Sequence, residues 1–147
     1  FLNLENQESV KNALKKISKK YVIIEKMIGN AIVELLVGIV HDPAHGMLLT
    51  IGAGGILTEI VSDTSSLLLP SSEDEVLKCF NQLKVSKIAK GYRGFSGVDV
   101  NQIVDAIMKI QEFVLDNRDK VFEIEINPLI VTNSEVIVAD ALIRKVT

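Results

Sequence analysis

The stretch FEIEINPLIVTNSEVIVADA, residues 122–141, decides the fold predicted for this chain. Phe122 and every second residue up to Ile126 are apolar, and glutamates stand between them. This period of two is typical of a strand with one apolar and one polar face. A second β-rich run, residues 136–138, follows the polar turn TNSE at residues 132–135. The stretch therefore predicts a β-hairpin.

The length of the hairpin loop sets which side chains face each other. If residues 133–134 form a two-residue loop, Asn127 pairs with Asp140. Directly opposed residues in antiparallel strands have Cβ atoms about 4.5–5.5 Å apart. Glu125 stands two positions before Asn127 and projects from the same face, and Glu123 lies one step further out. The pairing thus gathers one amide oxygen and two or three carboxylates.

Oxygen ligands of this kind suit Mg²⁺, which takes one or two carboxylates and keeps its other positions for water and phosphate oxygens. The alternative is a hairpin whose outer face is only solvated, and the spacing alone favours that alternative, because alternating glutamates are common in exposed strands. Pro128 cannot donate a ladder hydrogen bond, so it predicts a sheet edge or a bulge. A bulge would shift the register by one residue.

The composition limits the classes of protein that this chain can represent. Of its 147 residues, 48% are hydrophobic and 24% are charged, which predicts a folded core in one domain or in a small domain plus part of another. The net charge of −3 gives no basic surface for a nucleic acid. Cys79 is the one cysteine, so a disulfide framework and a cysteine-based metal site are excluded. Its place in a helical pattern predicts a buried structural residue.

No apolar run in the sequence reaches the ~18–20 residues of a membrane-spanning helix, and no signal peptide pattern is present. We therefore expect no membrane partner and a cytoplasmic location. The sequence begins at Phe1 rather than at methionine, and we expect it to be part of a longer protein.

Three β-rich runs in the first part of the chain predict consecutive antiparallel strands of one sheet. They are residues 21–28, 33–40 and 47–51. A fourth, short strand is expected at residues 65–69, ahead of the proline at position 70. Together with the hairpin, these runs predict a sheet that is mainly antiparallel.

Apolar residues at helical spacing predict three helices. They are expected at residues 8–17, after Pro70, and from Asp99 to residues 116–117. Ser9 is the expected cap of the first helix, Ser71 or Ser72 of the second and Asp99 of the third. Residues 85–89 fit either a helix or a strand. The fold class is therefore α/β, of the α+β type.

Three glycines within residues 52–55, GAGG, follow directly after a predicted strand. Such a stretch lets the backbone approach a ligand and turns its N–H groups toward an anion. It is neither a Walker A loop nor the dinucleotide fingerprint, because the spacing of both motifs is absent. A turn with only a structural role explains the glycines equally well.

Arg93 and the two histidines are further candidate ligand-binding residues. Arg93 stands between the glycines of KGYRG and can reach a phosphate, although an exposed arginine that stabilises a turn fits the pattern equally well. His41 and His45 lie four residues apart on a strand and turn, with no further soft ligands nearby. We expect no zinc site there.

Several segments, taken in order, resemble one family. They are EKM at residues 25–27, ELLVGI, HDPAHG, GAGGILTEI, KGYRG, EIEINPL and VAD. In this order they are similar to the ATP-grasp domain of ADP-forming acyl-CoA synthetases, which is related to the β subunit of succinyl-CoA synthetase. The resemblance covers essentially the whole chain. Its most specific pieces are E-x-N-P-L with the downstream aspartate, and G-x-G-G-I-x-x-E.

The resemblance implies an ATP-grasp fold, with a mixed or antiparallel sheet and flanking helices. It implies that residues 1–45 are the remainder of the first subdomain with the adenine-binding strand, and that residues 46–147 are the C-terminal subdomain with the metal hairpin. A lysine-bearing segment that holds the phosphates in relatives would precede Phe1.

The resemblance also implies roles for individual residues. Asn127 and Asp140 would be ligands of Mg²⁺, and Glu125 a direct or indirect metal contact. The implied metal set is Glu125, Asn127 and Asp140. The implied nucleotide set is Glu25, Lys26, Met27, Glu34, Gly52, Gly54, Gly55 and Arg93. In that set the backbone of residues 25 and 27 would bond the adenine, and Glu34 would lie near the ribose.

The function implied for the complete protein is the reversible conversion of acyl-CoA, ADP and phosphate into a carboxylic acid, CoA and ATP, through an acyl phosphate and a phosphohistidine. Mg²⁺ and ATP or ADP would be the cofactors. A CoA-ligase domain or subunit would hold CoA and the acid, in an oligomer. This chain alone is expected to be inactive. The alternatives are a regulatory synthetase-like module of a protein lysine acetyltransferase, and a domain with no nucleotide role.

Overall fold

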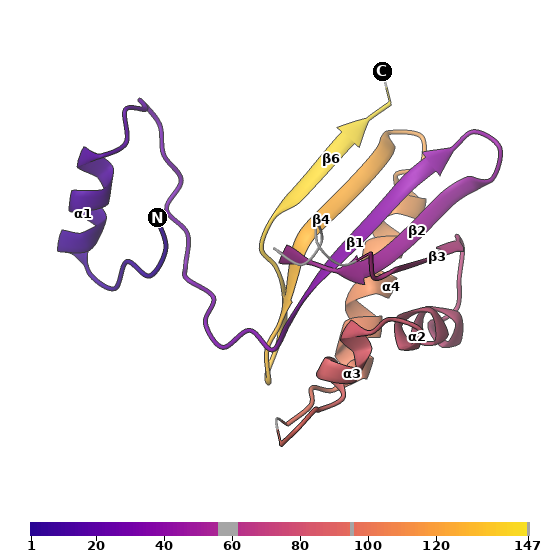
Figure 1. The fold of residues 1–147 in the computed structure, drawn as a ribbon. Coiled ribbons are helices and arrows are strands. Elements are labelled where there is room, and N and C mark those ends of the chain that lie inside the picture. Colours follow the sequence, from indigo (N-terminus) through magenta and orange to yellow (C-terminus); the bar gives the residue numbers. More distant parts are fainter. Residues whose placement is uncertain (56–61, 95, 147) are drawn as a thin grey trace.

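A six-stranded sheet with helices on one face organises the chain from Val33 onward (Figure 1). The computed structural model describes residues 1–55, 62–94 and 96–146. The elements are α1 (Gln7–Lys15), β1 (Val33–Asp42), β2 (Gly46–Ala53), β3 (Thr64–Leu68), α2 (Glu73–Asn81), α3 (Val85–Ala89), α4 (Val100–Asp116), β4 (Val121–Val131), β5 (Val136–Val138) and β6 (Ala141–Lys145). Within the described ranges, no helix is long and apolar enough to span a membrane.

The strand order is β3-β2-β1-β4-β5, and β6 also pairs with β4. Every neighbouring pair is antiparallel, as the sequence predicts. β1 and β2 pair from Leu35 opposite Ala53 to Asp42 opposite Gly46. The expected subdomain boundary between residues 45 and 46 falls in the turn of this hairpin.

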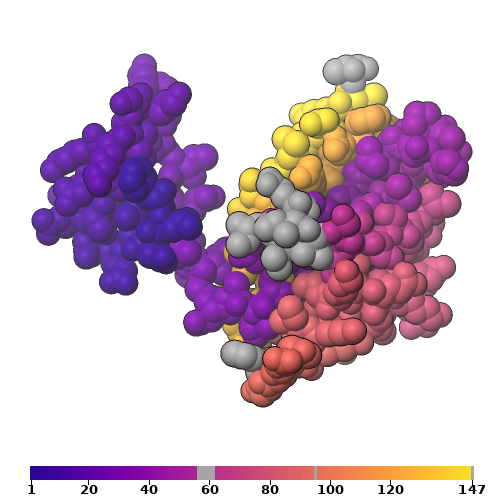
Figure 2. Space-filling model, viewed as in Figure 1, coloured from indigo at the N-terminus to yellow at the C-terminus, as the bar shows by residue number. Residues whose placement is uncertain are grey.

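The strand expected at residues 21–28 is wrong, because these residues belong to no helix or strand. Both edges of β1 are already occupied by β2 and β4, so the segment before β1 cannot pair beside it. Tyr21 and Ile23 are 81% and 86% exposed. The segment instead leads away from the start of β1 toward α1, as Figure 1 and the space-filling view in Figure 2 show.

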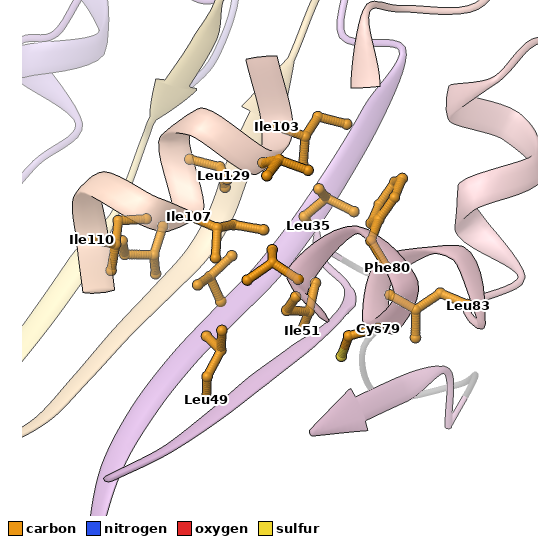
Figure 3. Close-up of a cluster of buried hydrophobic side chains, with 14 of the residues drawn as sticks. Leu35, Leu49, Ile51, Cys79, Phe80, Leu83, Ile103, Ile107, Ile110 and Leu129 are labelled. Atoms are coloured by element: carbon orange, nitrogen blue, oxygen red, sulfur yellow. The ribbon is translucent and has the colours of Figure 1, made fainter. Parts of the chain in front are cut away.

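The core lies between the sheet and helices α2, α3 and α4. Alternate residues of β1 point into it, so that Leu35 and Val37 have no exposed surface. In Figure 3, side chains of the sheet face Ile107 of α4 and Phe80 of α2. Cys79 is buried in the same cluster, which confirms the prediction for the single cysteine. The opposite face of the sheet carries no helix in the described part of the chain.

The helix starts follow from capping side chains. Ser72 caps α2 in a capping box with Glu75, and Asp99 caps α4, both as expected. The cap of α1 was wrongly expected at Ser9. Asn6 is the cap, because its side chain accepts the Ser9 N–H at 2.9 Å, while the Ser9 hydroxyl takes the reciprocal bond from the Asn6 N–H.

A buried carboxylate explains why residues 85–89 form helix α3. Asp63 accepts the N–H groups of Lys84 and Val85, each at 2.8 Å. These are two of the N–H groups that a helix start leaves without an intrahelical acceptor. The two bonds join residues 21 and 22 positions apart in the chain, so the periodicity of residues 85–89 could not predict them.

Two glycines, one at the end of β2 and one directly after it, are required by close packing. A Cβ on Gly54 would stand 2.5 Å from the backbone carbon of Leu35, and the Gly54 N–H donates to the Glu34 carbonyl oxygen at 2.8 Å. A Cβ on Gly52 would stand 2.7 Å from a methyl group of Thr64. The backbone of this segment therefore lies directly against β1 and β3.

We expect Gly54→Ala to lower the free energy of unfolding by about 1–3 kcal/mol or more, because the new methyl group meets backbone that cannot turn aside. Urea denaturation measures the change. Gly29→Ala is the matched control, since a Cβ there would meet nothing within 4 Å, and its effect should stay within about 0.5 kcal/mol. Equal losses in the two variants would contradict the packing account.

The capping box predicts a pH dependence of stability. Bonds from the Ser72 N–H and hydroxyl to the Glu75 carboxylate lower the pKa of Glu75 below its usual 4.5. A lowered pKa adds stability above the pKa of the unfolded chain, and this contribution is lost as the pH falls through the pKa of the folded state. The stability difference between wild type and Glu75→Gln should therefore shrink on acidification. The control is Glu112→Gln, which removes an exposed carboxylate of α4 that belongs to no capping box, and it should not reproduce this loss.

Candidate functional site

The hairpin of β4 with β5 and β6 holds the candidate metal residues in one register. The Thr132 N–H donates to the Glu135 carbonyl oxygen at 3.0 Å, which confirms the two-residue loop. Further along, the Asn127 N–H donates to the carbonyl oxygen of Asp140 at 3.2 Å. The expected opposition of Asn127 and Asp140 is therefore confirmed at the level of the backbone.

Pro128 does introduce a bulge, but on the side of β1. Leu35 pairs with Leu129 and Val37 pairs with Ile126, so that Leu36 alone faces two residues of β4. On the other side of β4 the Pro128 carbonyl oxygen accepts the Ala139 N–H at 3.1 Å, and the register of the hairpin loop continues unchanged. The register irregularity therefore lies in the pairing of β4 with β1, and the pairing of residues 127 and 140 is unchanged.

Polar side chains on this register line a cleft. Ile124 and Ile126 are buried toward the helices, so Glu125 and Asn127 point to the face without helices. The lining residues are Glu125, Asn127, Asp140, Ala141 and Leu142. Two carboxylates and an amide oxygen form a donor set that fits Mg²⁺. Within the described residues, no group of three or more histidine, cysteine, aspartate or glutamate side chains is placed to hold a metal ion.

Glu123, the outer acid of the series, is engaged elsewhere. Its carboxylate forms an ion pair with Arg144 of β6 at 3.0 Å. Phe122, predicted to share the apolar face of β4, is instead 40% exposed, since a register shift between Val121 and Glu123 turns Val121 into the core. Its ring lies 6.4 Å from the ring of His41.

The glycine loop meets the β4 hairpin at Gly55. The Gly55 N–H donates to the side-chain oxygen Oδ1 of Asn127 at 3.0 Å, across 72 positions of the chain. Gly55 has a left-handed backbone with φ +62°, and the carboxylate of Glu34 occupies the place where a Cβ on Gly55 would stand. The structure thus brings together three expected site residues, Glu34, Gly55 and Asn127. Residues 56–61, which follow in the GAGGILTEI motif, lie outside the described residues.

The N–H groups of the glycine loop point to protein oxygens in this structure. Gly54 donates to the carbonyl oxygen of Glu34, and Gly55 donates to the amide of Asn127. Local sequence patterns do not predict either bond, because both depend on the order of β2, β1 and β4 in the sheet.

The remaining expected nucleotide residues lie apart from this cluster. Glu25 and Met27 line a hollow against α1, and Lys26 is exposed. Arg93 stands in the loop after α3 with φ +48°, 5.4 Å from the ring of Tyr92. Tyr92 lines a second hollow, together with residues of the segment before β1 and of the hairpin loop.

A third hollow extends from Glu34 and was not foreseen. Its lining residues are Ala31, Ile32, Val33, Glu34, Gly54, Val85 and Ile88. Most of them are apolar, and Glu34 is the one charged residue among them. The sequence left residues 85–89 open between helix and strand. It therefore could not predict that helix α3 places Val85 and Ile88 beside β1.

The histidines form no shared site in the described structure. His45 Nδ1 lies 2.8 Å from the carboxylate of Asp42 in the turn between β1 and β2. This bond, with those from the N–H groups of residues 44 and 45, lowers the pKa of Asp42. His41 lies on β1 near Phe122, so the pair serves the turn and the strand separately.

Comparison with known proteins gives the family. The ATP-grasp domain family matches residues 1–144. The chain is 29% identical over 140 residues to the β subunit of acetate–CoA ligase [ADP-forming] II of Pyrococcus furiosus, covering 88% of this chain and 59% of that protein. It is 30% identical over 151 residues to the β subunit of ligase I of the same organism, covering 95% of this chain and 64% of that protein.

Solved structures agree with the sequence relatives. A Candidatus Korarchaeum cryptofilum dinucleotide-forming acetyl-coenzyme A synthetase 1, in complex with coenzyme A and Mg-AMPPCP, superposes with a TM-score of 0.87 at 29% identity. That superposition covers 97% of this chain and 66% of the other. The chain therefore spans about three fifths of the two β subunits and two thirds of this synthetase chain, and about a fifth of the longer ligases that it also matches. The expected fold is confirmed, and the chain belongs to the ATP-grasp domain family, where its relatives are ADP-forming CoA ligases.

Proposed function

We propose that this chain is the Mg²⁺-nucleotide-binding part of an ADP-forming acyl-CoA synthetase. The observation that carries the proposal is the cleft in which Asn127 and Asp140 stand opposite each other, with Glu125 beside them. A related synthetase has been solved with coenzyme A and Mg-AMPPCP, and its phosphohistidine segment points toward the nucleotide site. These two facts support magnesium and an adenine nucleotide as ligands.

In this proposal the hairpin residues are the metal ligands. The oxygens of Glu125, Asn127 and Asp140 would hold Mg²⁺, which would supply positive charge to offset the charge of the phosphates. Glu34 and Gly52–Gly55 are proposed to lie near the sugar and the phosphates. The contact between Glu34 and Gly55 supports placing these residues at one site. Arg93 is proposed to reach a phosphate or the phosphohistidine segment.

The adenine is proposed to lie along residues 25–27, held by the backbone of Glu25 and Met27. This segment has no strand partner in the described structure, so its backbone N–H and C=O groups are not used in the sheet. We also propose a subdomain boundary near Ala31, since β1 and β2 share one hairpin. Residues before that boundary would belong to the first subdomain.

The complete protein is proposed to interconvert acyl-CoA, ADP and phosphate with a carboxylic acid, CoA and ATP. A CoA-ligase domain or subunit would supply the CoA and acid sites, and the name "subunit beta" of two relatives supports assembly with another subunit. The relatives found are CoA ligases and a CoA synthase, including a 4-hydroxybutyrate–CoA ligase of Nitrosopumilus maritimus and a feruloyl-CoA synthase. This favours a ligase over a regulatory module of a lysine acetyltransferase.

We expect Asp140→Asn in the complete enzyme to lower nucleotide-dependent kcat/KM at least about 100-fold, because a carboxylate ligand is lost while side-chain size and backbone pairing are kept. Asn127→Ala should have a similar effect. Coupled assay of ATP formation from acyl-CoA, ADP and phosphate measures both. The matched control is Asp119→Asn, an exposed residue of the turn before β4.

Rates of Asp140→Asn equal to those of wild type would remove the metal assignment. Mn²⁺ binding, followed by water proton relaxation, provides a second measurement that does not depend on turnover. Wild type and Asp119→Asn should enhance the relaxation, and Asp140→Asn should not. Equal enhancement in all three proteins would place the cation elsewhere.

A further inference from the structure

We propose that Asn127 couples the metal cleft to the glycine loop: its Oδ1 holds the Gly55 N–H until a cation takes that oxygen, and the N–H is then released toward an anion. This inference rests on the proposed function, because it needs the cation at Asn127. Asn127 would thus be a positioning residue for Gly55 as well as a metal ligand.

The two neighbouring glycines are held in different ways. The Gly54 N–H donates to a backbone oxygen of β1, and the backbone of Leu35 fills the space around its Cα. Gly54 is therefore fixed by the sheet itself. The Gly55 N–H donates to a side chain instead, and that side chain lines the candidate metal cleft. The bond that can respond to a ligand is thus the one at Gly55.

Electrostatics favours release of the N–H when the cation arrives. The amide oxygen has two lone pairs, so there is room for the N–H group and a cation on the same oxygen. The hydrogen of an N–H group carries partial positive charge, however, and a divalent cation on the same oxygen would repel it at short range. The cation also draws electron density from the oxygen and weakens it as an acceptor.

The release has a direction that suits nucleotide binding. Glycine N–H groups in a loop of this kind are suitable donors to phosphate oxygens. Mg²⁺ is accompanied by phosphate oxygens in nucleotide sites. One event at Asn127 would therefore place the cation and offer the donor of residue 55 to the anion that comes with it. Linkage requires the reverse effect as well, so an anion at Gly55 would raise cation affinity at Asn127 by the same factor.

Hydrogen exchange of the Gly55 amide tests the bond without metal. The chain has nine glycines, so ¹⁵N-glycine labelling of the full chain gives a simple spectrum. Asn127→Ala should speed Gly55 exchange about three- to tenfold, because one hydrogen bond is lost, while Gly54 exchange stays unchanged. The control Asn12→Ala, an exposed asparagine of α1, should alter neither signal. Unchanged Gly55 exchange in Asn127→Ala would overturn the inference.

Titration of the wild-type chain with MgCl₂ alone tests the coupling and needs no variant. The Gly55 amide proton should move upfield and exchange faster, at the same midpoint as the shifts of Asp140 and Ala141. Shifts at residues 140–141 with constant Gly55 exchange would overturn the coupling and leave the proposed function in place. No response in the cleft at any Mg²⁺ concentration, with the metal-free Gly55 bond intact, would overturn both.

Discussion

The register between β4 and the chain that returns beside it is the constraint on which the site depends. Thr132 fixes this register, because its buried hydroxyl accepts the N–H groups of Ser134 and Glu135 at 3.2 and 3.1 Å and donates to the carbonyl oxygen of Glu135. From that turn the same pairing extends to Glu123 opposite Arg144. A slip by one residue would move every side chain to the other face. Glu125 and Asn127 would then enter the apolar core.

The two faces of the sheet have different roles. The face toward α2, α3 and α4 buries branched apolar residues, and this burial resists any slip of the strands. The other face carries the polar side chains of Glu125 and Asn127, and the glycine loop meets Asn127 there. Asn127 lies on this second face, where its backbone takes part in the ladder and its side chain reaches Gly55.

Much of this fold is predictable from local pattern. Strands β1, β2, β3 and the hairpin follow from apolar alternation and turn residues, and α2 and α4 follow from helical spacing and their caps. The opposition of Asn127 and Asp140 follows from the two-residue loop alone. These features depend on residues close together in the chain, or on a register that one turn transmits.

The remainder depends on contacts between distant segments. Residues 21–28 have the composition of a strand, but a strand needs a free neighbour, and both edges of β1 are taken. The helical state of residues 85–89 depends on the carboxylate of Asp63, and the place of Gly55 depends on the side chain of Asn127. No periodicity in the sequence carries such information.

The outermost strands of the described sheet also affect how copies of the chain behave at high concentration. β3 is only five residues long and begins Thr-Ser-Ser, and β6 ends in Arg144 and Lys145. Short, polar or charged rims offer a poor template for strand addition by a second molecule. The long apolar strands β1 and β4, which would aggregate readily if exposed, are enclosed between neighbours. The order of the strands therefore protects the chain against fibre-like self-association.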